Sequence, residues 1–409
     1  MVDPVNQLAD TVRIEGARIL ATLVRTVGSL PVAEDAVQDA IVSALREWPR
    51  SGIPSEPRAW LTAVARRKAI DALRREASRE AKERDSADLL DLATADLPTD
   101  ASMRDDQLRL IFTCCHPALA TEAQVALALR TLCGLSTTQI AAVLLTTESA
   151  MSKRLTRTRQ KIVAAHIPYR IPAPAELSNR LTAVCGVIHA LYTIGHAPIS
   201  GAAVVNIDMC AEAIRLGRLV VDVLPDEPQP TAVLALLLLT DARRFARADD
   251  VGDVVPLSDQ DRSLWSLEQI VEGCALLDAS LRRTGGIADP YQLQAAIAAE
   301  HARSPSYADT DWREIVRLYD LLLSVAPSAA TQLNRAVAVA EAAGAAAGLT
   351  ALTGIALSPR WHAVRGELLA RQGRYAEAVE ATTSALKGEL TAPEQRYRER
   401  RIAEWAARV

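Results

Sequence analysis

Two clusters of basic side chains in the first half of the chain have the residue types and the spacing that nucleic-acid binding requires. Between positions 148 and 166 there are five lysines and arginines and one acidic residue. Cationic side chains neutralise phosphates, and arginine, lysine and serine also bind the edges of bases. The residues of this cluster that we expect to contact DNA are Ser149, Ser152, Lys153, Arg154 and Arg157.

A helix must carry these side chains, because residues of the opposite face recur at helical spacing. This inward set is Met151, Leu155, Thr158 and Ile162. Thr147 is a suitable N-cap for that helix, and Ser136 with Gln139 forms a capping box that starts a shorter helix before it. Residues 136–163 therefore predict a helix-turn-helix whose basic second helix has the form that enters a DNA major groove. An αα-hairpin with a solvated basic face is the alternative.

The other basic cluster lies between positions 66 and 84, where eight lysines and arginines face four acidic residues. Pro57 is well placed in the first turn of the long helix that carries it. Trp60 belongs to the apolar pattern of this helix, which favours core packing over stacking on a base. Residues 49–57, rich in proline, glycine and serine, predict a loop that is not helical. The expected phosphate contacts are Arg66, Arg67, Lys68, Arg74 and Arg75.

Before this loop, residues 32–48 predict an amphipathic helix with an acidic outer face. Its expected inward side chains are Val37, Ile41, Leu45 and Trp48. Its expected outward side chains include Asp35, Gln38 and Asp39. From these residues alone the outward set is an ordinary solvated face.

Residues 8–166 resemble the sigma-70 family of RNA polymerase sigma factors, specifically the extracytoplasmic-function group. DAVQDAIVSALREW followed by PRAWLTAVARRKAIDALRRE is similar to their region 2, and AMSKRLTRTRQKI is similar to their region 4. Neither motif is strong alone. Both in this order, separated by a short polar linker, are specific.

The resemblance implies a role for each candidate residue. Asp35, Gln38 and Asp39 would dock on the β′ clamp helices of core polymerase, with the β flap as a further partner surface. The cations at positions 66–75 would neutralise promoter phosphates. A specificity loop would hold a base flipped from the non-template strand, and its residues here are Ser51, Gly52, Ile53, Pro54 and Ser55. The implied partners are RNA polymerase core and promoter DNA, and the implied protein has no active site and no cofactor.

The expected domains are region 2 over residues 1–85, an acidic flexible linker over 86–103, region 4 over 104–168, and a helical extension over 169–409. In the extension, we expect helices over 230–247 and 261–282, among others. Its last part resembles tetratricopeptide (TPR) repeats, with Gly373, Tyr375, Ala378 and Ala385 where paired helices nest. We therefore expect a TPR-like α-solenoid. The resemblance is to the subgroup with a fused extension, which implies control in cis; a protein-docking platform is the alternative.

Composition supports an all-α chain: 49% of the 409 residues are hydrophobic but only 4% are aromatic, and long β-branched runs are absent. The net charge of −4 argues neither for nor against nucleic acid. The sequence shows no signal peptide and no apolar run of membrane-spanning length, so we expect a cytoplasmic protein without membrane contact.

The six cysteines form no CxxC pair. Cys114, Cys115 and His116 are adjacent, and adjacent residues cannot all reach one tetrahedral metal without strain. We therefore expect buried side chains at a helix end rather than a metal or redox site. The extension shows no catalytic motif, so we expect no catalytic residues. A stand-alone helix-turn-helix regulator with a TPR-like sensor remains as the alternative function.

Overall fold

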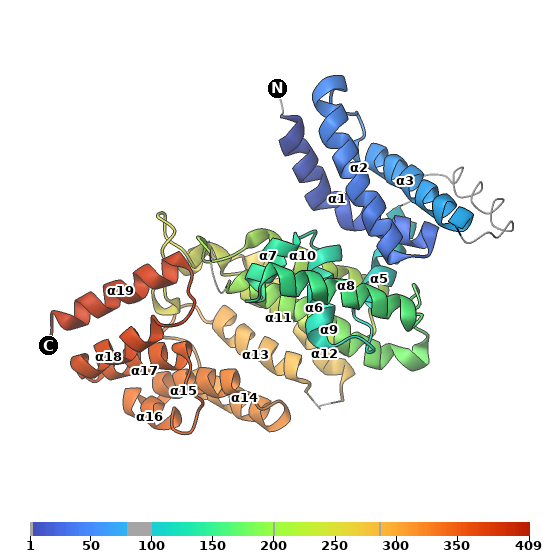
Figure 1. The fold of residues 1–409 in the computed structure, drawn as a ribbon. Helices are drawn as coiled ribbons and strands as arrows, with labels where there is room; N and C mark the ends of the chain where they lie inside the picture. The colour runs from blue at the N-terminus through green and yellow to red at the C-terminus, as the bar shows by residue number, and fades with distance from the viewer. Residues whose placement is uncertain (1–2, 80–99, 199–200, 286–287) are drawn as a thin grey trace. The chain divides into compact units, whose positions relative to one another are not determined.

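The computed structural model describes residues 3–79, 100–198, 201–285 and 288–409 (Figure 1). Within these ranges the regular elements are α-helices and short 3-10 turns, with two isolated β-bridges and no strand. The all-α prediction is confirmed. The chain divides into two compact units, residues 1–187 and 188–409. The domain boundaries expected from the sequence stay predictions.

The first unit begins with three helices that pack on one another (Figure 1). They are α1 (Pro4–Val27), α2 (Leu30–Ser51) and α3 (Pro57–Arg79). Their shared core buries Leu23, Trp48 and Leu61 almost completely. Trp60 packs edge-on against Trp48, with ring centroids 5.7 Å apart. This agrees with the interpretation of Trp60 as a packing residue.

The remaining helices of the first unit carry the predicted helix-turn-helix. They are α5 (Asp100–Cys114), α6 (Thr121–Thr131), α7 (Thr137–Val143), α8 (Glu148–Ala164) and the first half of α9 (Pro174–His196). The division between the two units falls within α9. Its Arg180 donates to the Phe112 carbonyl oxygen at 2.5 Å, and its Leu181 and Val184 are buried. The start of α9 is therefore part of the core of the first unit.

One boundary expected from the sequence is wrong. The loop was expected at 49–57, but α2 continues through Pro49 to Ser51. Proline supplies no N–H, yet its fixed φ suits a helix, and the Gly52 N–H closes the last turn on the Trp48 carbonyl. Helix α5 is described from Asp100, and most of the linker expected over 86–103 lies outside the described residues.

The second unit continues with helices that mostly pack on their neighbours in the chain. They are α10 (Ile207–Val223), α11 (Pro228–Asp241), α12 (Leu267–Arg283), α13 (Pro290–Arg303), α14 (Trp312–Val325), α15 (Ala329–Ala343), α16 (Ala345–Ala351), α17 (Pro359–Arg371), α18 (Tyr375–Ala385) and α19 (Ala392–Ala406). Three 3-10 turns lie between α11 and α12 at Arg244–Ala246, Leu257–Asp259 and Arg262–Leu264.

Two of these turns lie in segments that the sequence predicted to be α-helical. The helices expected over 230–247 and 261–282 end at Asp241 and begin at Leu267. A bridge between Ala248 and Val254 and a hydrogen bond from the Ser266 N–H to the Ala242 carbonyl fold the connection back on itself. Helical periodicity carries no signal for such a contact. The predicted ranges therefore ended the first helix too late and began the second too early.

Hydrophobic clusters in the second unit follow one another along the chain. One cluster joins α11, α12 and α13, the next joins α13, α14 and α15, and the last two join α15 to α17 and α17 to α19. Helices α13, α15 and α17 each serve two clusters. Cores that are shared only between neighbours are the mark of an α-solenoid. The TPR character of its repeats stays a prediction.

Glycine and alanine let these helices approach closely. Ala378 and Ala385 are buried between helices as expected, whereas Gly373 lies exposed in the α17–α18 turn with φ +74°. A close contact that cannot relax by a rotamer change is at Gly348 in α16. A Cβ added there would lie 2.5 Å from the Ala340 Cβ and 3.2 Å from the Ala336 carbonyl oxygen. Neither atom can move away by a rotamer change.

We predict that Gly348→Ala destabilises the second unit. The clash forces α16 away from α15 at a cost of about 1–3 kcal/mol, which opposes the roughly 1 kcal/mol that alanine gains over glycine in a helix. Gly217→Ala in α10 is the matched control, because its added Cβ would meet its nearest atom at 3.4 Å, an ordinary contact. Calorimetric unfolding should show a lower midpoint for Gly348→Ala than for Gly217→Ala. Equal midpoints would contradict the close packing.

Candidate nucleic-acid interface

The turn between α7 and α8 has the geometry of a tight helix-turn-helix. The Ser136 hydroxyl accepts from the Gln139 N–H at 3.1 Å, and the Gln139 side-chain oxygen accepts from the Ser136 N–H at 2.9 Å. The Thr147 hydroxyl accepts from the Ala150 N–H at 3.2 Å. Leu145 takes a left-handed conformation, φ +50°, which reverses the chain within a few residues. The predicted caps and turn are confirmed.

Helix α8 separates a buried stripe from an exposed polar face. The buried stripe is Met151, Leu155, Thr158 and Ile162, as the sequence predicted. On the outer side Ser149, Ser152, Lys153 and Arg157 are exposed, and Arg154 is half-buried. Within the part of the chain that the structure describes, no carboxylate forms an ion pair with Lys153, Arg154 or Arg157. These three cations are therefore available to phosphates or bases.

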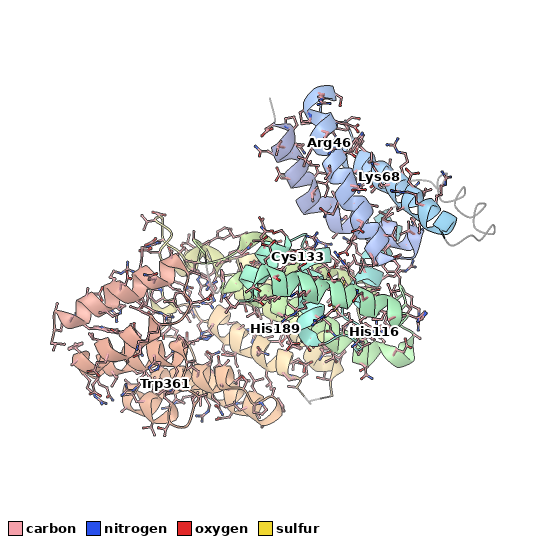
Figure 2. The ribbon with its side chains drawn as sticks, in the orientation of Figure 1. Arg46, Lys68, His116, Cys133, His189 and Trp361 are labelled. Carbon is pink, nitrogen blue, oxygen red and sulfur yellow. The ribbon has the colours of Figure 1, made fainter. Side chains whose placement is uncertain are left out.

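Helix α3 presents the other predicted basic face. Arg67, Arg74 and Arg75 are exposed, and Arg66 and Lys68 are half-buried (Lys68 is marked in Figure 2). The Arg75 Nε donates to the Asp71 carbonyl oxygen of its own helix at 3.1 Å. The inner face of α3 buries Leu61, Val64, Ala65, Ala69 and Ile70. Its cations thus lie on a rigid helix whose opposite face is locked into the core.

Helix α2 exposes all three residues of its predicted acidic face, Asp35, Gln38 and Asp39. Its inner face differs from the expectation in one residue. Leu45 was expected inward but is 46% exposed, beside Val42 at 43%. The buried positions are instead Ala33, Val37, Ala40, Ala44 and Trp48. Small alanines at the α1–α2 contact let the helices approach closely, so that the apolar stripe turns away from Leu45.

The predicted base-capture residues divide between a helix and a loop. Ser51 closes α2, whereas Gly52, Ile53, Pro54 and Ser55 lie in the short connection to α3. Gly52 and Ser55 are exposed and Ile53 and Pro54 are half-buried. Gly52 has φ +85°, a conformation that a side chain would strain. The loop beside the basic helix therefore covers residues 52–56 instead of the expected 49–57.

The adjacent thiols and imidazole do not converge on one point. Cys114 and Cys115 are buried, and burial raises the pKa of the Cys114 thiol to about 12 and that of Cys115 well above its ordinary value. The Cys114 Sγ lies 3.1 Å from the Thr131 hydroxyl, while the His116 Nδ1 accepts from the Ala118 N–H at 3.1 Å. Burial at a helix end, the expectation from the sequence, is confirmed for both thiols.

Comparisons with known proteins agree with this geometry. Residues 12–79 match the family model of Sigma-70 region 2, residues 109–162 that of Sigma-70 region 4, and residues 180–281 that of a family of unknown function (DUF6596). An uncharacterized protein of Rhizobium meliloti (strain 1021) is 42% identical over 397 residues, which cover 95% of this chain and 93% of the relative. No solved structure matches the chain. The chain belongs to the sigma-70 family.

Region 2, region 4 and an added domain in this order are the architecture of an extracytoplasmic-function sigma factor with a C-terminal extension. The resemblance read from the sequence is thus confirmed. A sigma factor of this family interacts with RNA polymerase core and promoter DNA and acts in transcription initiation. Among the described residues, no helix of this sigma factor is long and apolar enough to cross a membrane.

Three polar contacts link the helices of region 2 to region 4 and the residue that follows it, and two of them involve a buried carboxylate. In the first, the Arg159 Nε of α8 lies 2.6 Å from the Glu34 Oε2 of α2, whose side chain is only 7% exposed. In the second, the Arg25 Nε donates to buried Asp106 at 2.8 Å. The Tyr169 hydroxyl oxygen lies 2.6 Å from the Ala21 carbonyl oxygen, which joins the end of region 4 to α1.

The sequence analysis missed Glu34 and Arg159. Helical spacing places Glu34 three residues before Val37 on the inward face, which was a usable signal for Glu34 alone. Nothing in the sequence pairs it with a residue so far along the chain. Burial raises the pKa of the Glu34 carboxyl, although nearby Arg159 and Arg130 oppose that rise. The pair is therefore a costly charge contact that holds α8 against α2.

We predict that Arg159→Met lowers the stability of the first unit by about 2–4 kcal/mol, because it leaves the Glu34 carboxylate buried without its partner. The double variant Glu34→Met/Arg159→Met should recover most of the loss, since both charges are gone. Arg157→Met, an exposed neighbour on α8, is the matched control and should change stability by less than about 0.5 kcal/mol. A double variant as unstable as Arg159→Met would contradict this account of the pair.

The pH dependence gives a second readout of the same contact. The pKa of Glu34 is raised in the folded state, so its contribution to stability is complete below its ordinary pKa of 4.5. That contribution is lost as the pH rises through the raised value. Glu34→Gln cannot ionise, so wild type should lose stability relative to Glu34→Gln over this window in calorimetry. Parallel pH profiles would count against a buried, ionising Glu34.

Proposed function

We propose that this sigma factor contacts promoter DNA through the outer faces of α3 and α8. The observation that carries the proposal is the face of α8, where Lys153 and Arg157 are exposed opposite a fully buried stripe and have no carboxylate partner among the described residues. A helix seated in this way can enter a major groove with Ser149 and Ser152 toward the bases. The half-buried Arg154 lies on its flank.

The basic face of α3 would contact phosphates of the promoter segment that is melted. Its exposed Arg67, Arg74 and Arg75 and half-buried Arg66 and Lys68 supply positive charge without base recognition. The loop beside it, with Ser51 at its edge and Gly52 to Ser55 within it, would hold one extruded base. Extrusion costs a few kcal/mol, which phosphate contacts from the adjacent basic helix would help to offset.

The acidic face of α2 would dock on core polymerase. Asp35, Gln38 and Asp39 are exposed together on a helix whose other side is fixed in the core. The β′ clamp helices are the proposed target, and the β flap is the proposed contact of region 4. A stand-alone helix-turn-helix regulator, the second candidate, gives no role to this face or to the region 2 match.

The extension would control the sigma part in cis. Support comes from α9, whose Arg180, Leu181 and Val184 belong to the core of the first unit while its last residues belong to the second. A continuous helix shared by both units offers a direct route from a change in the extension to region 4. The alternative is a docking platform, in which the TPR-like extension binds a protein partner without influencing initiation.

We predict that Lys153→Ala/Arg157→Ala weakens promoter binding by the reconstituted holoenzyme and reduces the slope of log affinity against log salt by about two. Arg317→Ala/Arg374→Ala in the second unit is the matched control, because both arginines are exposed and each forms an ion pair with a glutamate three residues away. A separate variant, Asp39→Arg on α2, tests the proposed docking face. It should abolish binding to core polymerase in native gels. Unchanged salt slopes in the α8 variant would remove α8 from the DNA interface.

The proposed control in cis is tested by comparing the full chain with a truncation after residue 187. The first unit ends there, and a cut at 169 would remove Arg180, which contacts Phe112, together with the buried Leu181 and Val184. We expect run-off transcription to differ by at least about fivefold between the two forms, a typical coupling between sites. Higher activity of the truncated form would make the extension an inhibitor, and lower activity would make it an activator.

Two other results have a clear meaning. Equal transcription from both forms would support the docking platform and contradict control in cis. Failure of both forms to bind core polymerase, with intact folds by circular dichroism, would favour the stand-alone regulator.

A further inference from the structure

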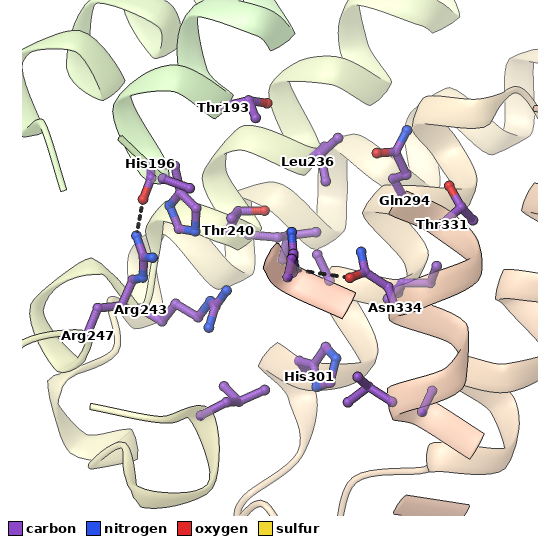
Figure 3. Close-up of a pocket in the computed structure, with 18 of the residues that line it drawn as sticks. Thr193, His196, Leu236, Thr240, Arg243, Arg247, Gln294, His301, Thr331 and Asn334 are labelled. Atoms are coloured by element: carbon purple, nitrogen blue, oxygen red, sulfur yellow. Dashed lines mark hydrogen bonds between the residues drawn. The ribbon is translucent and has the colours of Figure 1, made fainter. Parts of the chain in front are cut away.

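A cavity of about 960 Å³ lies within the second unit (Figure 3). It is lined by the end of α9, by α11, α13, α14 and α15, and by residues at the starts of α17 and α19. This is the upper part of the size range of small-molecule sites. Its apolar walls include Tyr192, Trp265, Trp312, Ile315 and Tyr319.

The polar lining carries more positive than negative charge. Arg243, Arg247, Arg360 and Arg398 line the cavity, against Glu389 and Glu394. The hydrogen bonds of these arginines go to neutral groups. Arg247 donates to the His196 carbonyl, Arg360 to the Asn334 side-chain oxygen at 3.1 Å and Arg398 to the Ala385 carbonyl at 3.1 Å. Within the described ranges, none of the four arginines is ion-paired.

Arg243 is the least compensated of them. Figure 3 shows Arg243 and Arg247 projecting from the same segment, with Arg243 directed into the cavity on the side of His301. No described residue hydrogen-bonds or ion-pairs with the Arg243 guanidinium. Burial and the charges of Arg247 and Arg262 lower the pKa of Arg243 to about 10, so it stays charged at neutral pH.

The nearby acidic and imidazole groups do not relieve this charge. Asp241 is fully buried and already paired with Arg244 at 3.3 Å. Glu394 is an electrostatic partner of Arg247 and Arg398. Burial with Arg243 and Arg262 lowers the pKa of His301 to about 4, so His301 is neutral at pH 7. A cluster of like charges in a partly desolvated site is unfavourable until an anion enters it.

We propose that this cavity is a binding site for a small organic anion, a carboxylate or phosphate ester with a flat apolar body. Arg243 is its main counter-ion and Arg247 its second. The tryptophan and tyrosine walls hold the apolar body. The site goes beyond the promoter function proposed above: it would make the extension a sensor of a metabolite-sized acid.

The test is calorimetric titration of the full-length protein with 2-naphthoate, 1-naphthyl phosphate and the neutral analogue 2-naphthamide. At least one anion should bind about tenfold more tightly than the amide. Arg243→Met should weaken that anion by about tenfold and leave the amide unchanged. Arg317→Met is the matched control, since Arg317 is 61% exposed on α14 and does not line the cavity. The relative affinity of the two anions separates a carboxylate ligand from a phosphate ligand.

Three results would overturn the proposal. These are equal binding of an anion and the amide, anion binding that survives Arg243→Met, and no heat of binding from either anion at concentrations of about 1 mM. If Arg243→Met does not fold by circular dichroism, the comparison of anion with amide on wild type still decides. The readout is binding and involves no polymerase, so failure of the proposed promoter function would leave this result unaffected.

Discussion

The burial of one stripe of α8 controls what the first unit can present to nucleic acid. Met151, Leu155 and Ile162 lose contact with water when they enter the core, and each contributes about 1.5–3 kcal/mol in doing so. A helix anchored along one side cannot rotate without exposing that stripe. The orientation of Lys153 and Arg157 toward solvent is therefore a consequence of packing on the opposite side, and their availability needs no special local geometry.

The contact between Glu34 and Arg159 differs from this apolar packing because it costs desolvation of two charged groups. It takes two charges out of water to join α8 and α2, and the raised pKa of Glu34 records the cost. An apolar pair would join the same helices with less desolvation.

The second unit is built by a different rule. Its helices share hydrophobic clusters only with near neighbours, and glycine or alanine at positions such as Gly348 sets how closely the pairs approach. Such a stack has no single central core. Polar and aromatic side chains can therefore line a cavity between the helices without disturbing the clusters. The cavity beside Arg243 is of this kind, and the non-helical connection between α11 and α12 forms one of its walls.

The sequence by itself determined the elements and most of their faces. Caps such as Ser136 and Thr147, the spacing of the α8 stripe, and the order of the two sigma motifs are local signals, and all three were confirmed. The roles of the individual site residues stay predictions. Only the tertiary structure decided that Leu45 faces outward, that Glu34 meets Arg159, and that no described residue is a counter-ion to Arg243. Each of these depends on residues far apart in the chain, and helical periodicity reports the face of a helix but not what packs against it.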